Sequence, residues 1–110
     1  MKMVVAVLRP EQLPAVKDAL FEADFKHLTA TSVMGTAPKT EQQMFRGVRR
    51  EVTLFRRVRV EVAVKDAHVE RAIEAITLGA NETGGWGHIF VTEISEVVKI
   101  WTGERGPRAL

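Results

Sequence analysis

The order of the apolar segments is the feature that most constrains how this sequence can fold. Segments with strand-like and helical periodicity alternate in two similar halves, each of which reads strand, helix, strand. A stretch without any apolar period separates the halves. With 110 residues, the chain has room for one domain. This order therefore predicts one sheet with both helices on the same face.

The first half starts with a Val-rich run from Lys2 to Leu8, which is typical of a strand buried on both faces. Pro10 suits the first turn of a helix, because its missing amide hydrogen is not needed there. Apolar residues at helical spacing then predict a helix from about Pro10 to Ala23. Leu28 to Gly35 is rich in β-branched residues and predicts a second strand.

The second half repeats this order with clearer signals. From Val52 to Val64, alternation of apolar and polar residues predicts a strand with one buried and one exposed face. Asp66 is suited to cap a helix that ends near Gly79. A glycine-rich loop from Asn81 to Gly87 then leads into a strand from Ile89 to Ile94.

Together these elements predict an α+β ferredoxin-like fold, βαββαβ, with a long loop between the second and third strands. Thr36 to Gln43 has no apolar period, and a loop of this length in a compact domain is usually functional or disordered. We expect the open face of the sheet to carry residues such as Val60 or Val62. Because so small a domain buries only part of its surface, subunit association would cover that face.

The composition excludes several classes of function. The chain contains no cysteine, which rules out disulfides, thiolate metal sites and a thiol nucleophile. No apolar run approaches the roughly 18 residues that span a bilayer, so we expect a cytoplasmic protein without membrane insertion. The histidines lack metal-ligand spacing, and no Ser-His-Asp or paired-carboxylate grouping is present. The sequence therefore predicts neither a metal site nor an enzyme.

Several segments, in the same order along the chain, resemble the PII nitrogen-regulatory family. The resemblance runs from the first strand to the tail, and it is carried by Arg9-Pro10, Thr29-x-Thr31-x-Val33-x-Gly35, Phe45-Arg46-Gly47, Gly85-Trp86-Gly87-His88-Ile89-Phe90-Val91 and Thr102-Gly103-Glu104-Arg105-Gly106. The chain is thus identified as a divergent member of this family.

The resemblance implies a homotrimer that binds ATP or ADP in the clefts between subunits and regulates a transporter, an enzyme or a transcription factor. It implies a single PII-like domain over 1–110. Within it, the large T-loop would cover about 36–51, the glycine-rich B-loop about 82–88 and the C-terminal tail about 102–110.

The resemblance also implies which residues line the nucleotide cleft. Three of them are glycines, which let backbone amides approach phosphate oxygens closely. The expected nucleotide-binding residues are Thr29, Gly35, Gly85, Gly87, His88 and Lys99.

The chain departs from the family pattern at the cationic positions. His88 stands where the B-loop usually has lysine, and histidine is only fractionally charged near neutral pH. Trp101 replaces one of two basic residues of the last strand, and Trp86 replaces the B-loop aspartate. Each indole either stacks on a base or covers a subunit interface. The residues after Gly35 lack the usual Arg-Gln, so the sequence supports 2-oxoglutarate and magnesium less than the nucleotide.

The expected partner-binding loop is strongly basic. Its candidate residues are Phe45, Arg46, Gly47, Arg49 and Arg50. Arg50 stands where many members carry a modified tyrosine, and the chain contains no tyrosine, which excludes nucleotidylation of that residue. Further arginines follow at 56, 57 and 59, and such a cluster fits an acidic partner surface, phosphate or nucleic acid, or simply a solvated face.

We therefore expect a PII-like regulator, most naturally in nitrogen regulation, that binds an adenine nucleotide and acts through its T-loop. Two other readings stay open at this stage. One is a PII-like regulator of bicarbonate or metal-ion handling with a changed ligand. The other is a basic nucleic-acid-binding ferredoxin-like module, although few aromatic residues are interleaved with its arginines.

Overall fold

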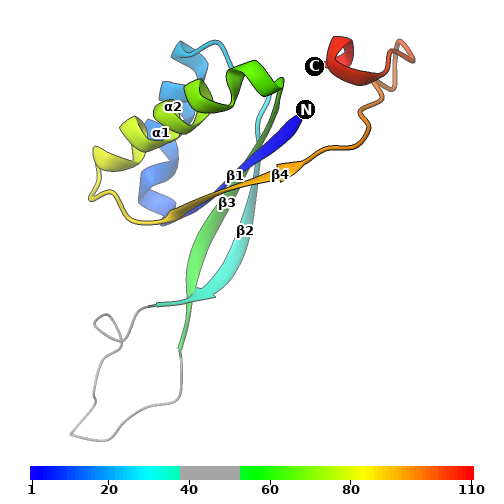
Figure 1. Cartoon of the computed structure of the whole chain (residues 1–110). Helices are drawn as coiled ribbons and strands as arrows, with labels where there is room; N and C mark the ends of the chain where they lie inside the picture. Colours follow the sequence, from blue (N-terminus) through cyan, green and yellow to red (C-terminus); the bar gives the residue numbers. More distant parts are fainter. Residues whose placement is uncertain (38–52) are drawn as a thin grey trace, which may run out of the picture.

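The computed structural model describes residues 1–37 and 53–110 (Figure 1). The main elements are β1 (Lys2–Leu8), α1 (Leu13–Glu22), β2 (Thr29–Thr36), β3 (Leu54–Val64), α2 (Val69–Asn81) and β4 (His88–Glu93). Short 3-10 turns are η1 (Pro10–Gln12), η3 (Asp66–His68) and η4 (Gly106–Ala109). The predicted βαββαβ order is confirmed. The expected long loop falls mostly on 38–52, which lie outside the described residues.

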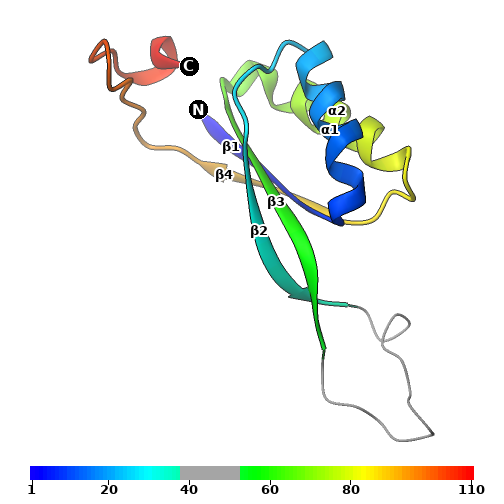
Figure 2. The ribbon, with the colours of Figure 1, turned by 180° about the vertical axis from the view of Figure 1, so that it is seen from behind.

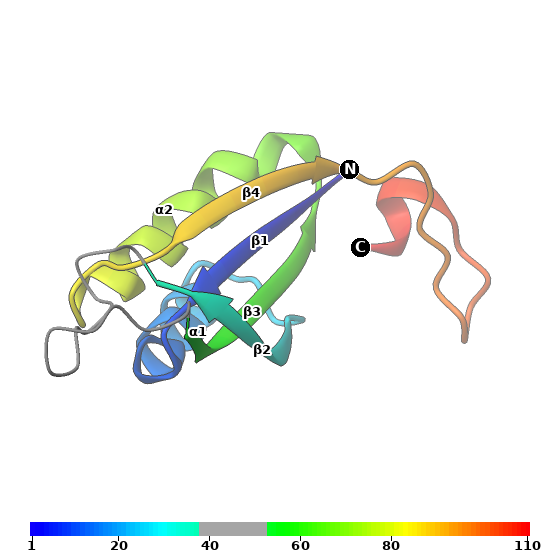
Figure 3. The same cartoon turned by 90° about the horizontal axis from the view of Figure 1, so that it is seen from below.

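The strands form one antiparallel sheet in the order β2-β3-β1-β4. Both helices cover the same face of it (Figures 1 and 3). β1 lies inside the sheet, hydrogen-bonded to β3 on one side and to β4 on the other. Consecutive residues Val4, Val5 and Ala6 are all buried, which confirms a strand covered on both faces. This arrangement is the ferredoxin-like fold.

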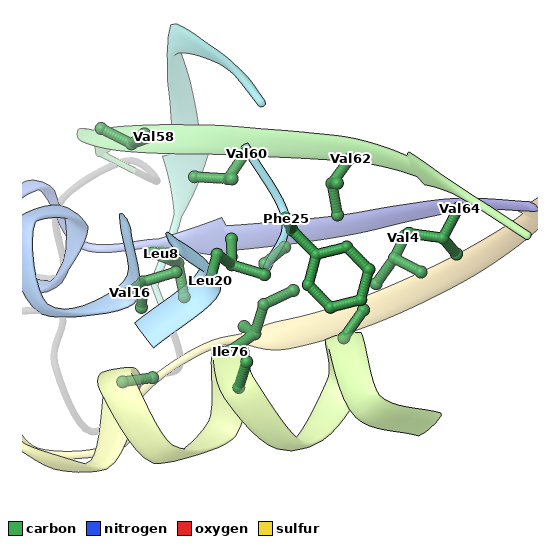
Figure 4. Close-up of a cluster of buried hydrophobic side chains, with 14 residues drawn as sticks. Val4, Leu8, Val16, Leu20, Phe25, Val58, Val60, Val62, Val64 and Ile76 are labelled. Atoms are coloured by element: carbon green, nitrogen blue, oxygen red, sulfur yellow. The ribbon is translucent and has the colours of Figure 1, made fainter. Parts of the chain in front are cut away.

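The core fills the space between the sheet and the helices (Figure 4). Its buried side chains are mostly Val, Leu, Ile and Ala from β1, β3 and the inner faces of both helices. The helices lie close together at Gly79, where an added methyl group would lie 2.6 Å from the Cα of Val16. Glycine is therefore required here for close backbone packing.

The prediction that Val60 and Val62 lie on the open sheet face is wrong. Val60 is fully buried and Val62 is 3% exposed, because both side chains point toward the helices. The predicted alternation of β3 is confirmed, but its two faces were assigned the wrong way round. The apolar side chains face the core. The residues that alternate with them, including Arg59 and Glu61, lie on the open face.

The two helices start differently from each other. Pro10 opens η1, which passes directly into α1, as the sequence predicts. Asp66 does not act as a helix N-cap, since Lys65 occupies the cap position of η3. The Asp66 carboxylate instead accepts a hydrogen bond from the Met1 ammonium group at 2.6 Å. That contact ties the start of β1 to the turn that follows β3.

The tail crosses to the end of the sheet where β1 begins. The Ile94 amide donates to the Met1 carbonyl, and Val98 forms an isolated antiparallel bridge with Arg105. The C-terminal turn η4 accordingly lies near the N-terminus, while the loop between α2 and β4 lies at the other end (Figures 1 and 2). In the described part of the chain, neither α1 nor α2 is long and apolar enough to cross a membrane.

Replacing Gly79 by alanine tests the close helix packing. Helix propensity alone favours alanine by about 1 kcal/mol. The methyl group would overlap the α1 backbone, however, so we expect a net loss of about 1–3 kcal/mol in the free energy of unfolding. Urea unfolding followed by circular dichroism measures this. The exposed neighbour Thr77→Ala is the control and should stay within about 0.5 kcal/mol of the wild type; a stabilising Gly79→Ala would contradict the packing.

The Asp66 contact predicts a pH-dependent contribution to stability. The hydrogen bond from the Met1 ammonium, helped by the charge of Lys2, lowers the pKa of Asp66 below its ordinary value of 3.8. Because the folded pKa is the lower one, the contribution is present above pH 3.8 and disappears as the pH falls through the folded value.

Asp66→Asn should therefore unfold at a lower temperature than the wild type at pH 7, and the difference should vanish in strong acid. Thermal unfolding between pH 2 and 7 measures it, with Asp18→Asn on the exposed face of α1 as the control. A difference that is constant with pH would contradict this role of Asp66.

Candidate functional site

The glycine-rich loop between α2 and β4 has a backbone that only glycine adopts easily. Gly84, Gly85 and Gly87 all have positive φ, at 95°, 66° and 127°. A side chain on Gly87 would also overlap the carbonyl oxygen of Val7. The loop therefore lies directly against the end of β1, and its positive-φ turns depend on glycine.

A buried glutamine anchors this loop to the start of α1. The Gln12 side chain is fully buried, and its Nε2 donates to the Ala80 carbonyl at 3.2 Å. The Gly85 amide donates to the same carbonyl at 2.9 Å. The Arg9 amide donates to Gln12 Oε1 at 2.8 Å. The turn after β1 and the root of the loop are thus joined through one side chain.

Gly35 belongs to the same end of the molecule. It lies opposite Phe55 in the β2–β3 register, and the Cγ of Arg57 is 3.5 Å from the position of a Gly35 side chain. The Arg57 guanidinium carbon in turn lies 4.4 Å from the centre of the Trp86 ring. Arg57 is only 7% exposed. Its side chain therefore connects Gly35 with the glycine-rich loop.

His88 is the first residue of β4 and completes this set of predicted residues. It pairs with Val7 of β1, is exposed, and stacks against Phe90 with ring centres 6.2 Å apart. We call Gly35, Gly85, Gly87 and His88 the loop-end group. A small hollow of about 130 Å³ beneath the loop is lined by three of these residues and by Trp86.

Thr29 does not join the loop-end group. It begins β2, six residues before Gly35, and a strand rise of about 3.3 Å per residue separates the two by roughly 20 Å. Thr29 also lies on β2, the opposite sheet edge from β4, which carries His88. It lines a hollow of about 420 Å³ together with Lys26, His27 and Glu61.

Lys99 also lies away from the glycine-rich loop, in the tail. Its Nζ is 3.8 Å from Glu104 Oε1 and 5.5 Å from the centre of the Trp101 ring. It lines a groove of about 660 Å³ that shares His27 with the hollow at Thr29. We call Thr29 and Lys99 the tail-end group. The structure of one copy thus divides the six predicted residues into two separate groups.

Apolar side chains near the tail-end group are exposed in a single copy. Ile100 is 92% exposed and Trp101 is 81% exposed. Trp101 therefore packs against no core of its own chain. Trp86, in contrast, is half-buried and contacts arginines, so the two indoles that the sequence singled out lie in different surroundings.

The predicted partner-binding residues Phe45, Arg46, Gly47, Arg49 and Arg50 lie outside the described residues. The rest of the basic cluster is described. Arg57 is buried against Trp86, and Arg59 Nε lies 2.9 Å from Glu61 Oε1. These contacts within the chain leave less positive charge for an extended phosphate-binding stripe. Within 1–37 and 53–110, no three His, Cys, Asp or Glu side chains gather as metal ligands would.

Sequence reasoning missed the roles of Gln12, Arg57 and Arg9 at this end of the sheet. Gln12 carried one signal, since it is a polar residue directly before the first apolar position of α1. The contact between Arg57 and Trp86 joins residues far apart in the sequence, so neither periodicity nor spacing pointed to it.

The fold and this loop define a ferredoxin-like protein with a glycine-rich loop between α2 and β4. The model of the family described as "Nitrogen regulatory protein P-II" matches residues 1–104. The chain is 39% identical over 114 residues to the nitrogen regulatory protein GlnK1 of Methanosarcina mazei, covering 100% of this chain and 97% of the relative. It is 42% identical over 113 residues to the nitrogen regulatory protein P-II of Azospirillum brasilense, with 100% of both chains covered.

A third relative, the nitrogen regulatory protein P-II of Rhodospirillum rubrum, is 41% identical with both chains fully covered. The chain belongs to the P-II family of nitrogen regulatory proteins. Its members are signal transducers rather than enzymes, which bears out the expectation of a regulator. The family generally binds ATP or ADP, assembles as trimers and regulates target proteins.

Replacing Gln12 by methionine tests the anchor of the glycine-rich loop. Methionine keeps the length of the side chain but neither donates to Ala80 nor accepts from Arg9. Because buried polar groups lose their partner, the free energy of unfolding should fall by about 1–3 kcal/mol. Hydrogen exchange of the Gly85 amide should also become faster. An unchanged exchange rate of the Gly85 amide in Gln12→Met would contradict the anchor.

Proposed function

We propose that this chain is a trimeric nitrogen regulator which binds an adenine nucleotide in clefts between its subunits. In each cleft, the loop-end group of one copy would face the tail-end group of a neighbour. The segment at about 36–51, with Phe45, Arg46, Gly47, Arg49 and Arg50, would contact an acidic surface of a target enzyme or transporter. A cytoplasmic location follows from the same family role.

The separation of the six predicted residues is the observation that carries this proposal. Within one copy, Thr29 and Gly35 lie about 20 Å apart along β2, and Lys99 lies in the tail beyond the far end of β4. No single nucleotide phosphate chain could contact both groups in one protomer. A rotational arrangement of copies, with different surfaces meeting at each interface, brings the two groups together.

The exposed apolar residues of the tail support the same arrangement. Ile100 and Trp101 are almost fully exposed in one copy, and large apolar side chains of this kind are commonly covered by a partner. Burial of Trp101 at the interface would place its ring beside the tail-end group. Either stacking on the base or covering the interface is consistent with that position.

The charges around the loop favour a nucleotide over 2-oxoglutarate with magnesium. Glycine amides, His88 and Lys99 supply hydrogen bonds and partial positive charge for phosphate oxygens. After Gly35 the chain continues with Thr36 and Ala37. Neither residue has a basic or amide side chain that could hold 2-oxoglutarate or the metal. The names of the relatives concern nitrogen regulation, which favours that role over bicarbonate or metal-ion handling.

Calorimetry with ATP, ADP, AMP and 2-oxoglutarate tests the ligand. We expect ATP or ADP to bind and 2-oxoglutarate to add little. His88→Lys, which places the full charge of an ammonium group at this position, should bind the nucleotide about tenfold more tightly than the wild type. Absence of binding by both ATP and ADP would contradict the proposal.

Mixing two inactive variants tests whether the cleft lies between copies. His88→Glu disables the loop-end group and Lys99→Glu the tail-end group, so each variant alone should bind poorly. After co-refolding at equal amounts, about one quarter of the clefts should combine an intact loop end with an intact tail end, because neighbours in a ring associate at random. If the co-refolded mixture regains no nucleotide binding, the two groups act within one protomer and the proposal is wrong.

A further inference from the structure

We propose that Trp86 is a positioning residue that joins the glycine-rich loop to the base of the β2–β3 hairpin. Its ring contacts two guanidinium groups that come from different elements. Arg57 approaches from β3, and Arg9 from the turn after β1. The inference goes beyond the proposed function, and only the ligand response described below rests on it.

The distances place these groups in one continuous stack. The guanidinium carbon of Arg57 lies 4.4 Å from the Trp86 ring centre and 5.4 Å from that of Phe55. The guanidinium carbon of Arg9 lies 5.3 Å from the Trp86 ring centre. All three values are within the range of cation–π attraction, for which indole is the best acceptor. Phe55, Arg57, Trp86 and Arg9 thus follow one another in contact.

Burial strengthens the Arg57 contact. Arg57 is 7% exposed, and its Nη1 donates to the Arg56 carbonyl at 2.9 Å. Cation–π attraction grows when the cation is removed from water. The planar guanidinium is also suited to lie against a flat ring, whereas a lysine ammonium is a compact charge. The Arg57 contact is therefore the stronger of the two.

The contacts of Trp86 with Arg57 and Arg9, which we call the joint, connect the glycine-rich loop with β2 and β3. The Arg57 side chain passes over Gly35, the one glycine of β2, before it reaches the ring. Trp86 itself is flanked by Gly85 and Gly87 of the glycine-rich loop, the loop proposed above to contact phosphate. An anion held at this loop attracts the same two guanidinium groups. It therefore competes with the ring for them and changes the position of Arg57 relative to β2.

Hydrogen exchange in the ligand-free protein tests the joint directly. Trp86→Ala should speed exchange of amides 54–57 and of the amides of Arg9, Glu11 and Gln12, by about tenfold if both cation–π contacts are lost. Trp86→Phe, which keeps an aromatic ring of smaller size, should restore most of the protection. Phe21→Ala, which removes an exposed ring that contacts Lys26 near the end of α1, is the matched control and should leave both segments unchanged.

Arg57→Lys separates the planar contact from the charge. It should behave like Trp86→Ala at amides 54–57, although its positive charge is kept. Fluorescence in a Trp101→Phe background adds a spectroscopic readout, because Trp86 is then the remaining indole. Its emission should shift to longer wavelength in Arg57→Lys as the ring becomes more exposed. Unchanged exchange at 54–57 in both Trp86→Ala and Arg57→Lys would overturn the joint.

The ligand response is measured in the same Trp101→Phe background. ADP and inorganic pyrophosphate should each change the Trp86 emission, and ADP should change the exchange at 54–57 in a Trp86-containing protein but not in Trp86→Ala. An equal change in exchange in both proteins would overturn the coupling. Failure of ADP to bind in calorimetry would count against the proposed function alone, since exchange in the free protein decides the joint.

Discussion

The burial of one sheet face beneath two helices fixes the strand register, and the positions of both groups of candidate residues follow from it. The side chains that point into the core are Val58, Val60, Val62 and Val64 of β3 and Val4, Ala6 and Leu8 of β1. Register errors of one residue would expose all of them, which makes the observed pairing strongly preferred. Once β1 and β4 are paired, the loop before β4 must lie where β1 ends. The tail after β4 must lie where β1 begins.

Close contacts then shape the loop end within this frame. Gly87 lies against the Val7 carbonyl, and Gln12 ties the root of the loop to the turn after β1. The Arg57 side chain brings β3 and Gly35 to the same place. These contacts form in a single copy, whereas Thr29 and Lys99 remain apart from them. In the proposed assembly, one subunit would therefore carry the two sides of a cleft rather than a whole one. Ile100 and Trp101, which are exposed in a single copy, would lie beside the side formed by the tail.

Much of the fold could be predicted because periodicity reports burial. The Val-rich run of β1 and the β-branched residues of β2 gave the correct elements, and the glycine-rich loop fell between α2 and β4 as expected. The face of β3 was assigned wrongly, since alternation alone does not say which side the helices cover. Asp66 was expected to cap a helix, but the nearby Met1 ammonium competes for its carboxylate. Contacts such as Gln12 with Ala80, or Arg57 with Trp86, depend on tertiary distances that no local pattern contains.

The central claim is that one nucleotide is held by the loop end of one copy and the tail end of another. A crystal structure of the protein grown with ADP tests it most directly. We predict that the phosphates contact the glycine-rich loop and His88 of one copy together with Lys99 of its neighbour. A nucleotide whose protein contacts all come from a single copy, or one bound away from the glycine-rich loop, would contradict this account.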